Sequence, residues 1–264
     1  MNIIFFTQED PFYVKVFFDE FFRLCDRLNE IKAVVISRPM GKKSLSQLAG
    51  QMYQFYGARD FVQVGCRFVW KKLMGRRKVR VGRGAELPKT HTVRQLCDAY
   101  GLKVFERSDI NSPGFQEMIR AYSPDLFISV ASPIIFRDAL IVIPRLATIN
   151  IHNAPLPNYR GMLPNFWQLY HGEKQAGITI HKIDTGIDTG DIVEQRFVPI
   201  DESDSLDDLI VKTKRLGAGM MLEVIEKFRN NTVSCREMPS GGSYFSFPGR
   251  ADVLEFKRRG KRLL

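Results

Sequence analysis

The chain has 264 residues, of which 44% are hydrophobic and 26% are charged, as expected for a soluble globular protein with one domain of ordinary size and at most a small appendage. No apolar run approaches the roughly 18 residues of a membrane span, and the first residues are not expected to form a signal peptide. The four cysteines are scattered, which favours reduced thiols in the cytoplasm over disulfides or a structural zinc site. The formal charge of +10 favours an anionic partner, such as a phosphorylated substrate, nucleic acid or an acidic membrane surface, without choosing among them.

The first forty residues predict the opening of a parallel α/β sheet. Residues 2–6 are expected to form a buried strand, the phenylalanine-rich residues 12–28 a core-facing helix, and residues 33–37 a second buried strand. A strand, a helix and another strand in this order are typical of a parallel sheet covered by helices.

Residues 41–89 interrupt this pattern and are predicted to form a helical, basic insert. Its basic side chains gather between residues 67 and 83, beside a run of apolar and aromatic side chains. One interpretation is a solvated helix with a basic carboxyl-terminal end, which suits the helix dipole. The other is an amphipathic segment that docks on an acidic membrane surface or on a polyanion such as tRNA.

Helices and strands alternate again after the insert. We expect strands at 103–106, 125–131, 147–152, 177–183 and 191–199, the last at an edge, and helices at 92–100, 114–121, 134–143, 165–171 and 206–228. From residue 232 the chain is expected to be irregular or a small hairpin.

The strand at 147–152 carries a polar pattern that suits catalysis. Asn150 and His152 are two residues apart, so both side chains leave the same face of the sheet. An amide can donate to a developing oxyanion, and an imidazole can be a second donor or carry a proton. Asp188, in the turn after the next strand, can hold the imidazole protonated or accept a proton through water. We expect these groups to converge beyond the sheet edge and to suit acyl transfer to a substrate amine.

Other interpretations of these residues are weaker. The tripeptide DTG occurs at 184–186 and 188–190, as in aspartic proteases, but here both copies lie in one turn. The alternating ligands of an EF-hand are missing. A metal site built from His152, His181 and an aspartate stays open as the minority interpretation, and no metal is expected. Motifs for nicotinamide and nucleoside triphosphate binding are missing.

Four motifs in this order resemble the formyltransferases that use 10-formyltetrahydrofolate, a family that includes glycinamide ribonucleotide, methionyl-tRNA and nucleotide-sugar N-formyltransferases. They are an N-x-H strand at 150–152, an L-P-x-x-x-G loop at 156–161, a G-x-T strand at 177–179 and a D-x-x-x-D-T-G turn at 184–190. Their combined order and spacing are specific. The resemblance is strong from about residue 125 to residue 229 and weaker over the first forty residues.

The resemblance implies an α/β fold with a Rossmann-like, mostly parallel sheet flanked by helices. Residues 1–200 would form the catalytic domain, with the insert at about 41–89, and residues 201–264 a C-terminal helix and a short tail. Asn150 and His152 would polarise the formyl carbonyl, and Asp188 would manage the proton that leaves the amine. The donor, 10-formyltetrahydrofolate, would contact Ser132, Pro133, Ile134, Ile135, Phe136, Arg160, Gly161 and Asp184.

The implied reaction transfers a formyl group from 10-formyltetrahydrofolate to a primary amine. About thirty-five residues follow Arg229, too few for the C-terminal barrel of methionyl-tRNA formyltransferases. A nucleotide-linked amino sugar, or a similar small anionic acceptor, is therefore expected first and methionyl-tRNA second. The remaining hypotheses are hydrolysis of 10-formyltetrahydrofolate and a non-catalytic basic module that binds a partner or a membrane.

Overall fold

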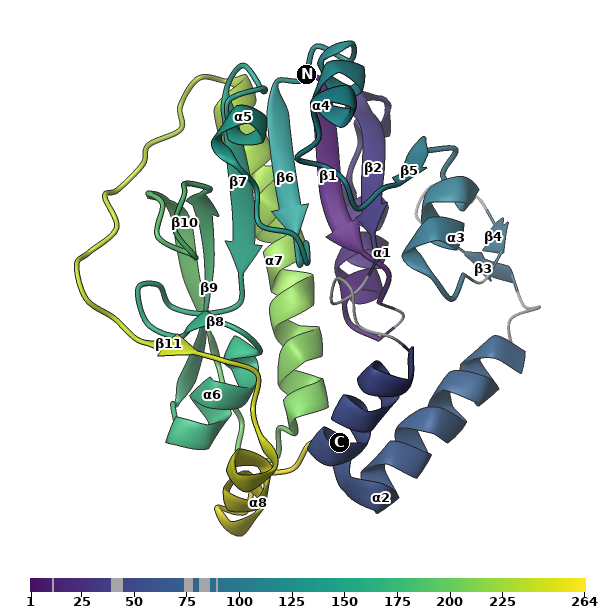
Figure 1. Ribbon diagram of the computed structural model, residues 1–264, viewed down its shortest axis with the longest axis vertical. Coiled ribbons are helices and arrows are strands. Elements are labelled where there is room, and N and C mark those ends of the chain that lie inside the picture. Colours follow the sequence, from purple (N-terminus) through teal and green to yellow (C-terminus); the bar gives the residue numbers. More distant parts are fainter. Residues whose placement is uncertain (11, 39–44, 74–77, 81–85, 89) are drawn as a thin grey trace.

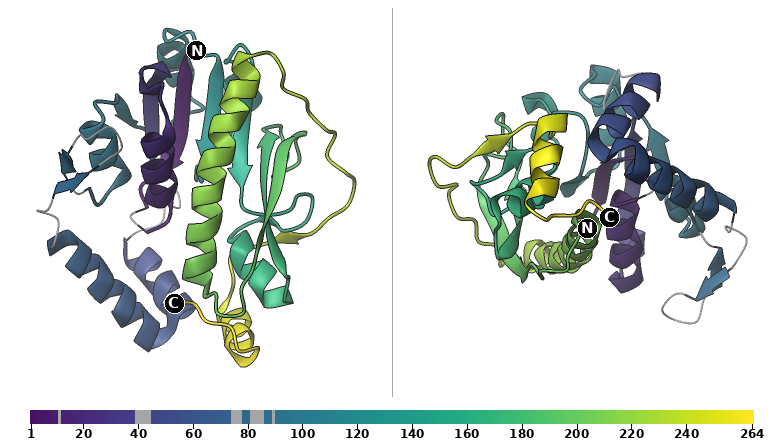
Figure 2. Two further views of the ribbon diagram at one scale, coloured as in Figure 1. Left: turned by 180° about the vertical axis from the view of Figure 1, so that it is seen from behind. Right: turned by 90° about the horizontal axis from the view of Figure 1, so that it is seen from below.

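A computed structural model of the protein describes residues 1–10, 12–38, 45–73, 78–80, 86–88 and 90–264. Within them a seven-stranded sheet lies between helices on both faces (Figures 1 and 2). Its strands, in spatial order, are β10 (Ile192–Pro199), β9 (Gln175–Lys182), β7 (Ala147–His152), β6 (Leu126–Val130), β1 (Ile3–Gln8), β2 (Ile31–Ser37) and β5 (Val104–Glu106).

The helices are α1 (Val14–Leu24), α2 (Leu45–Leu73), α3 (Val93–Ala99), α4 (Pro113–Arg120), α5 (Asp138–Ile141), α6 (Pro164–His171), α7 (Leu206–Arg229) and α8 (Arg250–Arg258), with a short 3-10 turn at Leu28–Glu30. Two small sheets complete the structure. One pairs β8 (Arg160–Gly161) with β11 (Tyr244–Phe245), and the other pairs β3 (Lys78–Arg80) with β4 (Glu86–Pro88).

The predicted Rossmann-like, mostly parallel sheet is confirmed. Strands β7, β6, β1, β2 and β5 run parallel to their neighbours, whereas β9 runs antiparallel to β7 and β10 antiparallel to β9. β10 lies at the edge, as expected. Every residue of β6 is buried, as is typical of a parallel strand with both faces covered.

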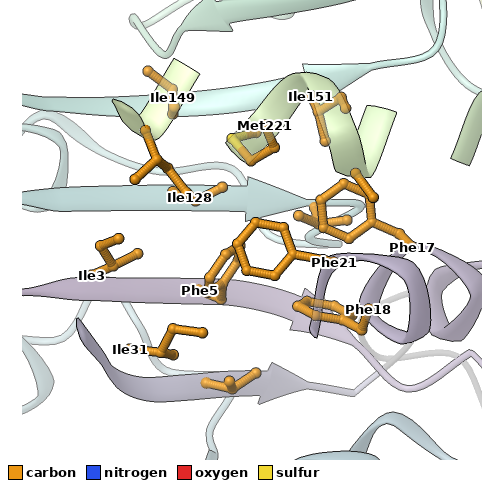
Figure 3. Close-up of a cluster of buried hydrophobic side chains, with 14 of the residues drawn as sticks. Ile3, Phe5, Phe17, Phe18, Phe21, Ile31, Ile128, Ile149, Ile151 and Met221 are labelled. Atoms are coloured by element: carbon orange, nitrogen blue, oxygen red, sulfur yellow. The ribbon is translucent and has the colours of Figure 1, made fainter. Parts of the chain in front are cut away.

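Helices α1 and α7 cover one face of the sheet (Figure 2, left). The apolar residues of α1 recur at helical spacing, and five of them are buried: Val14, Phe17, Phe18, Phe21 and Phe22. The rings of Phe5 and Phe21 meet edge to face with centroids 5.1 Å apart, and Ile149, Ile151 and Met221 extend this cluster (Figure 3). α7, predicted at 206–228, therefore packs in the main core; the division of the chain at residue 200 stays a prediction.

A second cluster covers the opposite face, where α4 and α5 pack on β1, β2 and β6. A third cluster lies beside the sheet and joins α6, α8 and the first turns of α7, with Phe55 of α2 buried among them. The ring of Phe55 lies 5.9 Å from that of Phe166 and 5.4 Å from that of Phe247. The insert is thus attached to the rest of the protein through an aromatic contact.

Two sequence predictions were wrong. The helix expected at 134–143 is limited to α5, because Asn111 binds the preceding backbone: its side chain donates to the carbonyl of Ile135 and accepts from the amide of Arg137. The tail is neither irregular throughout nor a hairpin. It contains β11, which pairs with β8, and α8, whose Phe256 stacks on Phe166 with centroids 4.6 Å apart.

The expected helix in the insert is present as α2, which is interrupted at Gly57. Arg67, the first residue of the predicted basic segment, pairs with Asp207 at 2.8 Å. Residues 74–77 and 81–83 of that segment lie outside the described residues. No helix in the described part of the chain is long and apolar enough to cross a membrane.

The N-terminus of α7 generates a prediction about stability. Ser205 caps the helix by accepting from the amide of Asp208 (3.2 Å), and Asp208 accepts in return from the amide of Ser205 (3.0 Å). Ser205→Ala should lower the free energy of unfolding by about 1 kcal/mol, measured by urea denaturation. Exposed Ser203→Ala should change it by less than about 0.5 kcal/mol. Equal losses in both variants would contradict the capping role.

Candidate active site

The pairing of β7 with β9 brings three polar side chains onto one face of the sheet. Ile149 and Ile151 point into the core under α7, so Asn150 and His152 stand on the opposite face, as predicted. Asn150 lies directly opposite His181 in the antiparallel register, so His181 shares that face. The Asn150 amide nitrogen lies 3.1 Å from Nε2 of His181.

His181 was not predicted as a member of the catalytic set. Its Nδ1 lies 2.7 Å from the carbonyl of Lys182 and must donate there, so Nε2 of the neutral ring accepts from the Asn150 amide. The second N–H of the Asn150 side-chain amide is not used in this contact. The pattern of the strand at 177–183 could not reveal the contact, because it depends on which strand β9 pairs with and in which direction.

His152 is buried, and its hydrogen bond determines the tautomer. Nε2 lies 2.8 Å from the carbonyl oxygen of Tyr159 and donates to it, which leaves Nδ1 unprotonated in the neutral ring. Nδ1 lies 3.7 Å from Oδ2 of Asp188. Burial lowers the pKa of His152 below its ordinary value of 6.5, although the Asp188 charge and the Tyr159 carbonyl oppose that shift. The neutral ring therefore presents a lone pair toward a carboxylate.

Asp188 is ionised despite its burial. Burial alone would raise the pKa of Asp188, but His152, His181 and the amide of Gly161 outweigh it and hold this pKa well below the usual range. The Gly161 N–H donates to Oδ2 at 2.9 Å, and Oδ1 lies 3.5 Å from Nε2 of His181. The Gly161 amide thus donates to the Asp188 carboxylate, and the carboxylate charge in turn stabilises a proton taken up by either imidazole.

The route by which Asp188 reaches His152 differs from the expected one. β9 is antiparallel, so the turn after Lys182 follows the amino-terminal half of β7 rather than its carboxyl end. The turn folds back over the sheet face that carries Asn150 and His152. Gly190 permits this fold, since a Cβ there would lie 2.1 Å from the carbonyl of Lys182. The predicted convergence beyond the sheet edge is therefore replaced by convergence over the face.

The residues expected to hold the folate have different surroundings. Gly161 touches Asp188 directly, and Arg160 adjoins it with a buried Nε that has no hydrogen-bond partner among the described residues. Asp184 is exposed and accepts from the amide of Gly186 (3.0 Å) and the hydroxyl of Thr189 (2.7 Å). These contacts shape the turn, and a role of Asp184 in folate binding stays a prediction.

The segment after β6 belongs to the same predicted folate site. β6 lies beside β7 in parallel, with Ser129 opposite Asn150, so the loop that follows it leaves the sheet near the end of β7. Ser132, Pro133 and Ile134 are half-buried and Ile135 is 65% exposed. Phe136 is only 4% exposed and lies against Phe6 with ring centroids 4.9 Å apart. The side chain of Phe136 is part of the core, and its burial does not support the predicted contact with folate.

The described residues of this site do not form a metal cluster. Among the residues that the structure describes, no group of three or more His, Cys, Asp or Glu side chains is arranged to hold a metal ion. A cavity of about 320 Å³ lies at the opposite end of the sheet, where Ile3, Cys25 and Arg229 contribute to its lining. The residues that line this cavity do not include those of the candidate site.

Comparison with known proteins identifies relatives of this chain. The family model described as formyl transferase matches residues 74–225, more than half of the chain and including Asn150, His152 and Asp188. A methionyl-tRNA formyltransferase of Ehrlichia ruminantium (strain Welgevonden) is 36% identical over 151 residues, which is 56% of this chain and 49% of the relative. The chain spans about half the length of the curated relatives it matches.

Solved structures share the fold. Glycinamide ribonucleotide transformylase 1 from Symbiobacterium toebii superposes with a TM-score of 0.59 at 16% identity, covering 90% of this chain and 94% of that one. The N-formyltransferase from Helicobacter canadensis, solved with folinic acid and dTDP-3-aminofucose, has a TM-score of 0.55 at 18% identity, covering 93% of this chain and 71% of that one. These likenesses confirm the predicted fold.

The coupling between His152 and Asp188 predicts how His152 titrates. In the wild type, the NMR titration midpoint of His152 should lie below 6.5, because burial disfavours the charged ring. Asp188→Asn should move the midpoint lower still, since it removes the charge that favours imidazolium. Asp191→Asn is the matched control, because Asp191 lies in the same turn but pairs with Lys182 at 3.3 Å.

The lowered pKa of His152 also predicts how the stability of the protein changes with pH. In the unfolded chain His152 takes up a proton near pH 6.5, whereas in the folded protein it does so only at lower pH. Between these two pH values the unfolded state therefore binds more protons than the folded state. The free energy of unfolding should therefore fall as the pH drops below 6.5. A midpoint above 6.5, or one that rises in Asp188→Asn, would contradict this account.

Proposed function

The chain belongs to the formyl transferase family, and we propose that it transfers a formyl group from 10-formyltetrahydrofolate to a primary amine. The observation that carries the proposal is the arrangement of three side chains on one sheet face: an amide donor (Asn150), a neutral imidazole (His152) and an ionised carboxylate (Asp188). This is the set of groups that formyl transfer to an amine requires, and no protein nucleophile is needed.

The proposed reaction begins when the acceptor amine attacks the formyl carbon and a C–N bond forms. The carbonyl oxygen becomes an oxyanion, and the free N–H of Asn150 donates to it. The amine proton passes to Nδ1 of His152, and the Asp188 carboxylate, 3.7 Å from that nitrogen, stabilises the imidazolium. Collapse of the intermediate breaks the bond to the folate nitrogen, which takes the proton and leaves as tetrahydrofolate.

The hydrogen bond of His152 favours one of the two roles left open by the sequence. Its Nε2–H is used by Tyr159, so the neutral ring has no second N–H for the oxyanion. Nδ1, by contrast, has a lone pair that faces Asp188 and can accept a proton. We therefore assign His152 to proton transfer and the oxyanion contact to Asn150.

For the acceptor, the relatives reverse the order that the sequence suggested. The curated relatives at 34–36% identity are methionyl-tRNA formyltransferases, which supports methionyl-tRNA as the first acceptor to test. A nucleotide-linked amino sugar is the second. Both carry phosphate groups, so a cation near the site would favour either acceptor.

We propose Lys214 of α7, the helix that covers the sheet face opposite Asn150, as the cation for such an acceptor. It lies on α7, one turn before Gly217, where a Cβ would come within 2.6 Å of Ile151 of β7. Only 8% of Lys214 is exposed, and its charge interacts with His152. Burial lowers its pKa to about 8, and the charge of Asp10 opposes that shift. A buried ammonium at this place offers a charge-assisted contact to a phosphate.

The catalytic roles predict large losses of turnover. Asn150→Ala, His152→Gln and Asp188→Asn should each lower kcat about 100-fold or more while the protein still binds folate, because the contacts they remove strengthen in the transition state. Turnover is measured as tetrahydrofolate release with methionyl-tRNA, a dTDP-linked amino sugar and glycinamide ribonucleotide as acceptors. Asp191→Asn should stay within about twofold of the wild type.

Parallel assays separate this proposal from the other hypotheses. Formate release at full rate without an amine would indicate hydrolysis of the donor instead. Folate binding without any turnover would indicate a binding module. Near-normal rates in Asn150→Ala, His152→Gln and Asp188→Asn would overturn the assigned roles.

Lys214 predicts a pH-dependent acceptor KM. Lys214→Met keeps the length of the side chain and removes its charge, so the acceptor KM should rise about tenfold or more with little change in kcat. In the wild type the same KM should rise as the pH passes about 8, where Lys214 loses its proton, and this dependence should vanish in the variant. The matched control is Lys212→Met on the same helix, because the half-buried Lys212 ammonium pairs with Asp204 at 2.6 Å. An unchanged KM in Lys214→Met would remove Lys214 from the acceptor site.

A further inference from the structure

After α7 the chain returns to the candidate site by a long route. It passes outside β10, where Arg236 bridges to Ile192 through two backbone hydrogen bonds of 2.8 Å, and reaches β11 beside β8 (Figure 1). We refer to residues 241–247 as the C-terminal strap. Its position next to β8 raises the question of what it does for the loop that contacts His152.

The strap binds the backbone of residues 159–162. The hydroxyl of Ser243 accepts from the amide of Tyr159 at 2.9 Å, and its carbonyl accepts from the amide of Arg160 at 2.9 Å. The carbonyl of Phe245 accepts from the amide of Met162 at 2.8 Å. The amide between these contacts, that of Gly161, is directed instead to Asp188.

The backbone of residues 159–161 holds both His152 and Asp188, the two ionisable side chains of the proposed catalytic site. The Tyr159 carbonyl accepts from Nε2 of His152 at 2.8 Å, and the Gly161 amide donates to Oδ2 of Asp188 at 2.9 Å. The position of residues 159–161 thus determines the tautomer of His152 and supplies the only backbone amide shown to contact the Asp188 carboxylate within the described chain.

Glycines let the two backbones approach closely. Gly161 (φ +94°) and Gly242 (φ +86°) both have left-handed conformations. A Cβ on Gly161 would lie 2.3 Å from the carbonyl of Phe245, and a Cβ on Gly242 would lie 2.1 Å from the carbonyl of Pro157. On the side-chain level, the ring of Phe245 stacks on Trp167 with centroids 4.7 Å apart. The strap is therefore packed against the loop through backbone and side chains together.

We propose that the C-terminal strap positions His152 and Asp188 for the reaction, with Ser243 as a positioning residue. The inference rests on the proposed function. If residues 159–161 shift, His152 is free to adopt the other tautomer, and Asp188 loses its amide donor. A displacement of about 1 Å in a reacting group can cost about 100-fold in rate.

The first test compares two adjacent glycines. Gly242→Ala meets the carbonyl of Pro157 and should displace the strap, whereas Gly241→Ala has the same left-handed backbone (φ +88°) with no atom within 4 Å of the new Cβ. The full-length variants are assayed with 10-formyltetrahydrofolate and methionyl-tRNA. Gly242→Ala should lower kcat at least tenfold, and Gly241→Ala should stay within about threefold of the wild type.

The second test uses Ser243 and a spectroscopic readout. Ser243→Ala should lower kcat, and Ser243→Thr, which keeps the hydroxyl, should restore most of it. In the ligand-free proteins, the ¹⁵N shifts of His152 report which ring nitrogen carries the proton. They should show Nε2–H in the wild type, Gly241→Ala and Ser243→Thr, and a mixture of tautomers in Gly242→Ala and Ser243→Ala.

The outcomes separate this inference from the proposed function. If the wild type formylates no amine, the proposed function fails, and the ¹⁵N shifts alone decide whether the strap positions His152. A changed tautomer in Gly242→Ala but not in Gly241→Ala supports positioning. If kcat falls while the tautomer and the titration of His152 stay as in the wild type, the strap contributes only stability and the inference is overturned.

Discussion

The antiparallel pairing of β7 with β9 is the contact on which the candidate site depends. It places His181 opposite Asn150, where the two side chains meet at 3.1 Å, and it directs the chain into the turn that carries Asp188. A parallel strand in this place would leave its turn at the other end of the sheet. The reversal of one strand in a mostly parallel sheet therefore brings a carboxylate over the face that holds His152.

Burial and charge then assign different protonation states to neighbouring groups. His152 and Asp188 lie in the same buried region, where a lone charge is costly. The carboxylate accepts from the Gly161 amide and stays ionised, whereas burial lowers the pKa of His152 and leaves its ring neutral. The result is a neutral base beside a fixed anion, which can take up one proton at little cost because the charge that stabilises it is already in place.

The sequence predicted the elements well, because helices and buried strands show their packing in residue spacing. Alternation along β7 was sufficient to place Asn150 and His152 on one face. His181 was missed because its role depends on the partner and direction of β9, which are tertiary properties. Phe136 was expected at the folate, yet it packs on Phe6 in the core. The strap was missed because its contacts with 159–162 are mostly made by backbone atoms, which any sequence possesses.

Several residues of the site have unfavourable backbone conformations, which are held in place by contacts with distant parts of the chain. Tyr159, Leu163 and Asp188 all have positive φ angles, of 61°, 53° and 54°, and such conformations cost of order 1–3 kcal/mol each. They persist only where surrounding contacts hold them in place. Around Tyr159 those contacts come from the strap, which lies more than eighty positions further along the chain, as the hydrogen bond to Ser243 shows. The proposed role of the strap therefore couples the geometry of the candidate site to the folding of the C-terminal segment: the loop would hold its conformation, and His152 its tautomer, only when the last part of the chain has docked.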